Sequence, residues 1–219
     1  MKLNWFSPVP PTPSPAALQT AAVLPALAKH ATVTLWVHEA SSSPDLDQHA
    51  RVCRYDPDGM PWDEINAADA TVYHLGNEAQ IYGPIREVKR QHPGIVILHD
   101  LGPLQDSASI GAALENAIAV VVDTPAAYSL VSEFATFPVS LLPFSSLSET
   151  PDSETVEDHV NGLLDLVKTT LESPGHEVVR WMASRTGRTL RPWFFEAAAG
   201  VLVTGVAQTI KDLFDDRPN

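Results

Sequence analysis

The 219-residue sequence is poor in cysteine and in basic side chains. Cys53 is the single cysteine, which excludes an intramolecular disulfide and a metal site built from several cysteines. Its strand-like surroundings favour a small buried side chain over a nucleophile. The 14 lysines and arginines are outnumbered by 27 acidic residues, and the net charge is −13. Such a chain repels phosphate backbones and anionic lipid, which argues against nucleic acid and polybasic membrane docking. A nucleotide pocket stays possible, because it needs only a few local donors.

Long hydrophobic runs are also missing. The most apolar run, 197–207, is about half of the ~20 residues that span a bilayer, so no transmembrane segment is expected. The N-terminus enters Leu3–Phe6 directly, without the basic and apolar stretches of a secretory signal. We therefore expect a cytoplasmic protein. The histidines outside the motifs described below lack metal-ligand spacing, and no metal site is expected.

Short β-branched runs alternate with longer amphipathic stretches along the first two thirds of the chain. This alternation predicts βα units and a single doubly wound, mostly parallel sheet with helices on both faces, a Rossmann-like α/β fold. The predicted strands are Leu3–Phe6, Thr32–Val37, Arg51–Tyr55, Thr71–His74, Ile95–His99, Ile118–Val122 and Val139–Pro143.

Two helix starts are clear in the sequence, because a hydroxyl residue precedes a proline at Ser14 and at Thr124. The first helix is predicted to run to about Lys29, with Pro25 kinking it or ending it early. Its inward side chains are expected to be Leu18, Ala22, Leu24 and Leu27. A further helix is predicted over 82–91, where His92-Pro93-Gly94 stops it.

The character of the chain changes after the last strand. Residues 1–146 are predicted to form the α/β domain, and 147–155 are polar and typical of a linker. Residues 156–219 are predicted to be helical, with helices at Val156–Leu171, Glu177–Thr186 and about Pro192–Phe214. Because the last of these is strongly apolar, we expect this segment to pack back on the α/β body or on another chain, and a homodimer is possible.

Ligands of open α/β sheets bind beyond the carboxyl ends of the strands. The loop after the first predicted strand, Ser7 to Pro15, has no glycine, which disfavours an NAD or FAD site. Ser7 and Thr12 could still contact a ligand, whereas Ser14 is better explained as a helix cap.

Two other strand ends carry polar residues. Gly76 permits close approach, and Asn77 either contacts a ligand hydroxyl or caps the next helix. His99 and Asp100 lie where a general base or a hydrogen-bond donor would sit, or they are a satisfied polar residue and a turn cap.

Taken together, these motifs resemble a known family. The Tyr73-His74-Leu75-Gly76-Asn77 turn, a helix, then Pro93-Gly94-Ile95-Val96-Ile97-Leu98-His99-Asp100 resembles the N-terminal, acceptor-side domain of retaining GT-B glycosyltransferases. Asn4 to Pro11 is similar to the family's first strand and loop, and the resemblance covers roughly residues 2–146. It implies that His99 lies near the donor sugar and acceptor, with Asn77 and Asp100 lining the same cleft.

The chain also departs from this family. Pro13 and Pro15 stand where the first loop usually carries glycine, and Gln105 stands where many relatives have a further histidine. Between 145 and 156 there is no room for the family's second, donor-binding domain. The last predicted helix is similar to the GT-B helix that returns to the N-terminal domain.

The resemblance implies a glycosyltransferase-related protein of saccharide or cell-envelope glycan biosynthesis. His99 and Asp100 would be its catalytic residues, and Ser7, Thr12, Gly76, Asn77 and Gln105 would bind a glycan or lipid-linked acceptor. No cofactor is expected on this chain alone, and a nucleotide-sugar donor would need a separate donor-domain protein. The alternatives are a non-catalytic binding or regulatory module derived from such an enzyme, and an unrelated nucleotide-binding or receiver-like module. A receiver needs clustered acids after the first strand, where Ser7-Pro8 stands.

Overall fold

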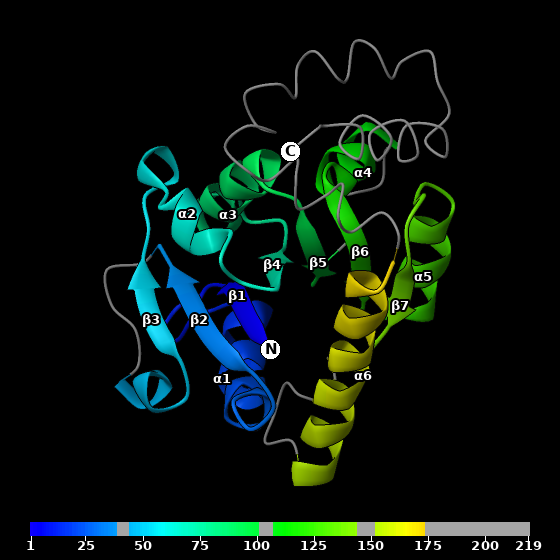
Figure 1. The fold of residues 1–219 in the computed structure, drawn as a ribbon. Helices are drawn as coiled ribbons and strands as arrows, with labels where there is room; N and C mark the ends of the chain where they lie inside the picture. Colours follow the sequence, from blue (N-terminus) through cyan, green and yellow to red (C-terminus); the bar gives the residue numbers. More distant parts are fainter. Residues whose placement is uncertain (39–43, 101–106, 144–151, 174–219) are drawn as a thin grey trace, which may run out of the picture. The chain divides into compact units, whose positions relative to one another are not determined.

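A seven-stranded parallel sheet forms the centre of the protein, with strand order β3-β2-β1-β4-β5-β6-β7 (Figure 1). The computed structural model describes residues 1–38, 44–100, 107–143 and 152–173. The strands are β1 (Lys2–Phe6), β2 (Thr32–Val37), β3 (Arg51–Arg54), β4 (Ala70–Leu75), β5 (Gly94–Leu98), β6 (Ala117–Val122) and β7 (Val139–Leu141). Every pair of neighbours is parallel, which confirms the predicted doubly wound α/β fold.

Both faces of the sheet are covered, as a parallel sheet requires. On one face α1 (Pro15–Leu27) and α6 (Ser153–Leu171) pack with strand residues such as Trp5, Val72 and Ile97. On the other face α3 (Ala79–Gln91), α4 (Ser107–Leu114) and α5 (Pro125–Ser132) pack with the alternate strand residues. Every residue of β4 and β5 is buried, which explains their continuous apolar sequences.

Both predicted helix caps are present. The Ser14 hydroxyl accepts a hydrogen bond from the Ala17 amide at 3.1 Å, and the Thr124 hydroxyl accepts one from the Ala127 amide at 3.2 Å. Helix α1 continues through Pro25 and ends at Leu27, two residues before the predicted end. Each cap therefore identified its helix from local chemistry alone.

The predicted inward face of α1 is partly wrong. Leu24 and Leu27 are buried, but Leu18 is 52% exposed. The residues that turn inward beside it are Gln19 and Thr20, both buried. They find polar partners on the sheet and on α6, and these partners rotate the apolar side chain of Leu18 outward.

Helix α6 belongs to the same compact unit as the sheet, residues 1–171. It begins at Ser153, three residues before the predicted start, and buries Val160, Leu163 and Val167 in the core that it shares with α1. This agrees with the expectation that a helix after the linker packs back on the α/β body. The predicted helices over 177–186 and 192–214 lie outside the described residues. Among the helices that the structure describes, none is long and apolar enough to cross a membrane.

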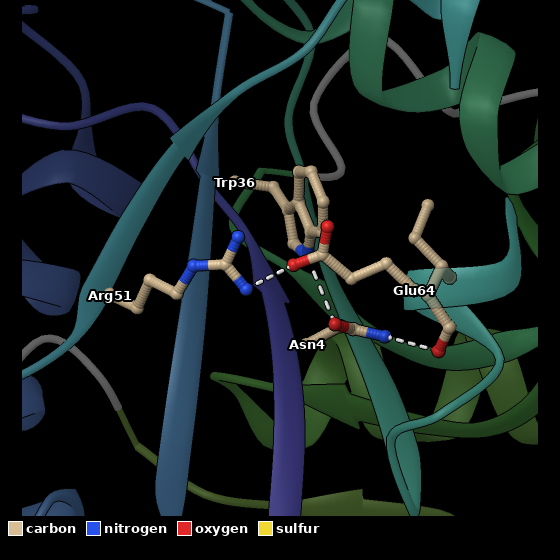
Figure 2. Close-up of polar contacts among 5 residues, drawn as sticks. Asn4, Trp36, Arg51 and Glu64 are labelled. Carbon is tan, nitrogen blue, oxygen red and sulfur yellow. Dashed lines mark hydrogen bonds and ion pairs between the residues drawn. The ribbon is translucent and has the colours of Figure 1, made fainter. Parts of the chain in front are cut away.

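The buried side chain of Asn4 connects β1 to three other segments (Figure 2). Its amide nitrogen donates to the Ile65 carbonyl at 2.8 Å, at the end of the short helix α2 (Trp62–Ile65), and to the Thr71 hydroxyl at 3.2 Å. Its oxygen accepts from the Trp36 indole at 2.9 Å. An exposed ion pair between Arg51 and Glu64 lies nearby. The amide thus satisfies buried polar groups of β2, β4 and α2 at once.

We predict that Asn4→Leu lowers the free energy of unfolding by about 2–4 kcal/mol, because the Trp36 N–H and the Ile65 carbonyl lose their partner inside the protein. Arg51→Gln, which removes an exposed ion pair, should cost no more than about 1 kcal/mol. Urea unfolding followed by circular dichroism measures both. Equal losses in the two variants would contradict the role assigned to Asn4.

Candidate functional site

The carboxyl ends of β1, β4 and β5 lie side by side, and the order in which strands are added to the sheet reverses between β1 and β4. From β1 the sheet grows outward to β3 and then restarts at β4 on the other side, which is the switch point where open α/β sheets bind ligands. Ser7, Asn77 and His99 each follow one of these strand ends. The His99 amide donates to the Leu75 carbonyl at 2.9 Å, so His99 continues the pairing of β5 with β4.

His74 and His99 form a stacked, hydrogen-bonded pair on the face covered by α1 and α6. Nδ1 of His74 lies 2.8 Å from Nε2 of His99, and the ring centroids are 5.0 Å apart with an interplanar angle of 20°. The ring centroids of Trp5 and His74 are 4.7 Å apart. His99 keeps partial exposure, whereas His74 is fully buried. His74 belongs to the Tyr73–Asn77 turn motif, but no separate role was predicted for it.

Burial keeps this pair neutral at physiological pH. Desolvation lowers the pKa of His74 well below its usual value, and the neighbouring histidines add to the effect. Desolvation lowers the pKa of His99 to about 3, with a smaller contribution from His159. Across the 2.8 Å contact one ring donates and the other accepts. The pair therefore acts through hydrogen bonds, and its rings are weak bases.

A third histidine belongs to the same region. His159 of α6 is buried, and its Nε2 lies 3.0 Å from the amide nitrogen of Gln19 on α1. Because an amide N–H donates, this ring nitrogen accepts, and the imidazole is neutral. Desolvation lowers the pKa of His159 to about 4, although the Asp123 carboxylate acts in the opposite direction. We call His74, His99 and His159 the histidine cluster.

The histidine cluster has unused hydrogen-bonding capacity. Nε2 of His74 and Oε1 of Gln19 are buried and have no hydrogen-bond partner among the described residues. A buried polar atom without a partner costs about 1–3 kcal/mol. Within the described ranges no group of three or more His, Cys, Asp or Glu side chains could hold a metal ion.

The first loop is held by its own hydrogen bonds. The Trp5 indole donates to the Thr20 hydroxyl at 3.0 Å, Thr20 donates to the Ser7 hydroxyl at 2.7 Å, and Ser7 donates to the Pro8 carbonyl at 2.8 Å. Ser7 is buried within this chain of bonds, and it joins β1 to α1. Thr12 is partly exposed, and its amide donates to the Val9 carbonyl at 2.9 Å.

Gly76 and Asn77 follow β4 on the side of α3. A Cβ atom on Gly76 would collide with the Tyr82 ring. The group that closely approaches this glycine is therefore the Tyr82 side chain of the same chain. The N-cap of α3 is Glu78, and Asn77 does not cap that helix. Instead, the amide nitrogen of Asn77 is buried without a hydrogen-bond partner among the described residues.

Asn77 lines a pocket of about 340 Å³ between α3 and α4. The lining residues are Leu75, Asn77, Arg86, Lys89, Arg90, Ser109, Ala112 and Ala113. This pocket and the histidine cluster involve opposite faces of the sheet, since its helices are α3 and α4 and the helices of the cluster are α1 and α6. Asp100 is exposed beside His99, and Gln105 lies outside the described residues.

Comparison with known proteins gives no assignment. No protein-family model matches the chain. A search of curated proteins likewise finds no match. The fold is a Rossmann-like parallel α/β sheet, and the argument for function rests on the residues at its carboxyl edge.

We predict that the histidine cluster makes the protein sensitive to acid. The pKa of His159 is about 4 in the folded protein, against ~6.5 for an ordinary histidine. Below about pH 6.5 the unfolded chain therefore binds more protons than the folded protein, and the free energy of unfolding falls toward about pH 4. The expected slope from His159 alone approaches ~1.4 kcal/mol per pH unit.

Urea unfolding at a series of pH values measures this slope. His159→Gln keeps an amide in contact with Gln19. It should make the slope shallower by the contribution of about one bound proton, ~1.4 kcal/mol per pH unit. His49→Gln, a matched change just before the edge strand β3, should leave the slope as it is. A slope that His159→Gln does not change would show that the acid sensitivity arises elsewhere.

Proposed function

We propose that this chain is a glycosyltransferase-related protein, the acceptor-side half of a GT-B enzyme. In this proposal a glycan or lipid-linked sugar binds at the carboxyl edge of β4 and β5, beside Asn77 and His99. Sugar transfer requires a nucleotide-sugar donor held by a separate donor-domain protein. The observation that supports the proposal is the position of His99. Its amide bonds the end of β4, and its ring is stacked on His74, next to the switch point between β1 and β4.

The chemistry of His99 supports binding to a sugar hydroxyl. A hydroxyl both donates and accepts. Because Nε2 of His99 is bonded to His74, Nδ1 is the ring nitrogen that would bond the hydroxyl, as a donor or an acceptor according to the tautomer. With its pKa at about 3, the His99 ring is a poor proton acceptor, so it orients the hydroxyl and does not deprotonate it. Asp100, exposed at the next position, is the carboxylate that would receive the proton of the attacking hydroxyl.

The leaving diphosphate of a nucleotide-sugar needs positive charge or hydrogen-bond donors in the transition state. In our proposal the donor-domain partner supplies these groups, in a cleft that it shares with the carboxyl edge. Because the partner supplies the positive groups, a chain with a net charge of −13 can take part in sugar transfer.

A non-catalytic binding module is the second candidate. The weak basicity of His99 favours it, as does Ser7, whose hydroxyl is committed to Thr20 and the Pro8 carbonyl. Both candidates share saccharide binding at His99 and differ in transfer. A transfer assay with a reconstituted donor-domain protein separates them.

We predict that short oligosaccharides bind the chain and that His99→Gln weakens their binding about 3–10-fold, as expected for one lost neutral hydrogen bond. Isothermal titration calorimetry measures the affinity, with His49→Gln as the matched control and urea unfolding to verify that each variant is folded. Unchanged saccharide affinity in His99→Gln would refute the assigned role. Tight binding of UDP- or GDP-sugars by the isolated chain would refute the need for a donor-domain partner.

A further inference from the structure

The pocket between α3 and α4 has the size and lining of a small-molecule site. Its volume of about 340 Å³ lies at the lower end of the range of ligand pockets, ~300–1,000 Å³. Leu75, Ala112 and Ala113 supply apolar walls, and Asn77 and Ser109 supply polar groups. Apolar walls with a few convergent polar groups are typical of binding sites for small organic molecules.

Positive charge is concentrated in this pocket. Arg86, Lys89 and Arg90 lie on one side of α3, because residues three and four positions apart on a helix are neighbours. The described residues that line the pocket include no aspartate or glutamate, although the net charge of the chain is −13. Lys89 is buried, Arg86 is partly buried and Arg90 is exposed, so positive charge extends from the interior to the surface.

These like charges repel one another inside a partly desolvated space. Burial, together with Arg90 and Arg86, lowers the pKa of Lys89 to about 8, even though Glu115 acts in the opposite direction. Lys89 donates to the Glu115 carbonyl and Arg86 to the Gly76 carbonyl, which are neutral groups. Among the described residues, Arg90 is the one cation of the three with a carboxylate partner, Glu87 at 2.8 Å. A bound anion would reduce this repulsion.

Donors remain for such an anion. A guanidinium has five N–H groups and an ammonium three, and the bonds to the Gly76 and Glu115 carbonyls each use one N–H group. The amide nitrogen of Asn77 is buried without a hydrogen-bond partner among the described residues. An acceptor oxygen of a ligand in the pocket would supply that partner. Three different side chains thus offer donors to one ligand.

We propose that the pocket between α3 and α4 binds a small organic phosphate, with Arg86, Lys89 and the Asn77 amide as donors to its phosphate group. A phosphate presents several acceptor oxygens, which match a planar guanidinium in bidentate fashion. The apolar walls and the volume leave room for an organic part the size of a sugar. This inference does not depend on the proposed glycosyltransferase relationship, because it requires neither His99 nor a transfer reaction.

Titration calorimetry of the full chain with glucose 1-phosphate tests the proposal, at about 0.15 M salt so that diffuse attraction is screened. Arg86→Gln should weaken binding about 10-fold or more, since it removes charge-assisted hydrogen bonds. Arg51→Gln removes the same charge on β3, far from the pocket residues in the sheet order, and should leave the affinity within about 2-fold. Glucose alone should bind much more weakly than glucose 1-phosphate.

A second pair of variants avoids any change in charge. Ala112→Phe places a ring in the pocket from the exposed side of α4 and should abolish binding, whereas Ala126→Phe on the exposed surface of α5 should not affect it. The proposal is overturned if glucose 1-phosphate fails to bind at millimolar concentration. It is also overturned if Arg86→Gln and Arg51→Gln weaken binding equally, or if folded Ala112→Phe binds as well as the unmodified chain. Loss of oligosaccharide binding in His99→Gln with glucose 1-phosphate binding retained would separate this site from the proposed acceptor site.

Discussion

The hydrogen bond between His74 and His99 is the interaction on which the account of this protein depends. It holds the end of β5 against β4, one strand from the switch point between β1 and β4, and it is made by two rings that burial keeps neutral. Helices α1 and α6 cover the core on this face, and His159 of α6 contacts Gln19 of α1. The packing of α6 and the hydrogen-bonding character of the carboxyl edge are therefore coupled. A positive charge on any one of these rings would disturb the helix packing and the ligand chemistry together.

The sheet separates two kinds of polar chemistry. The histidine cluster, on the face of α1 and α6, offers neutral donors and acceptors that suit hydroxyl groups. The pocket between α3 and α4 offers cations that suit a phosphate. Asn77 follows β4 and takes part in the second of these sites while lying at the same sheet edge as His99.

The elements that local chemistry determines could be predicted from the sequence, and those that depend on distant partners could not. Ser14 and Thr124 identified their helices because capping involves only the next few residues. Leu18 was predicted inward and is exposed, because Gln19 bonds His159, 140 positions away, and Thr20 bonds Trp5 and Ser7. Alternation places His74 on the same face as Val72 and His99 on the same face as Ile97, so their pairing was accessible once β4 and β5 were known to be neighbours. The pocket depends on how α3 packs beside α4, for which no local pattern exists.

The most direct measurement is the titration of the ring nitrogens of His74 and His99 by ¹⁵N nuclear magnetic resonance. We expect both rings to stay neutral from about pH 7 down to about pH 5, with one nitrogen of each ring protonated and a hydrogen bond between them. An imidazolium signal from either ring that appears with an ordinary midpoint, near pH ~6.5, would contradict it. In that case the carboxyl edge would be a solvated, basic surface, and the proposed role of His99 in binding a sugar hydroxyl would have to be abandoned.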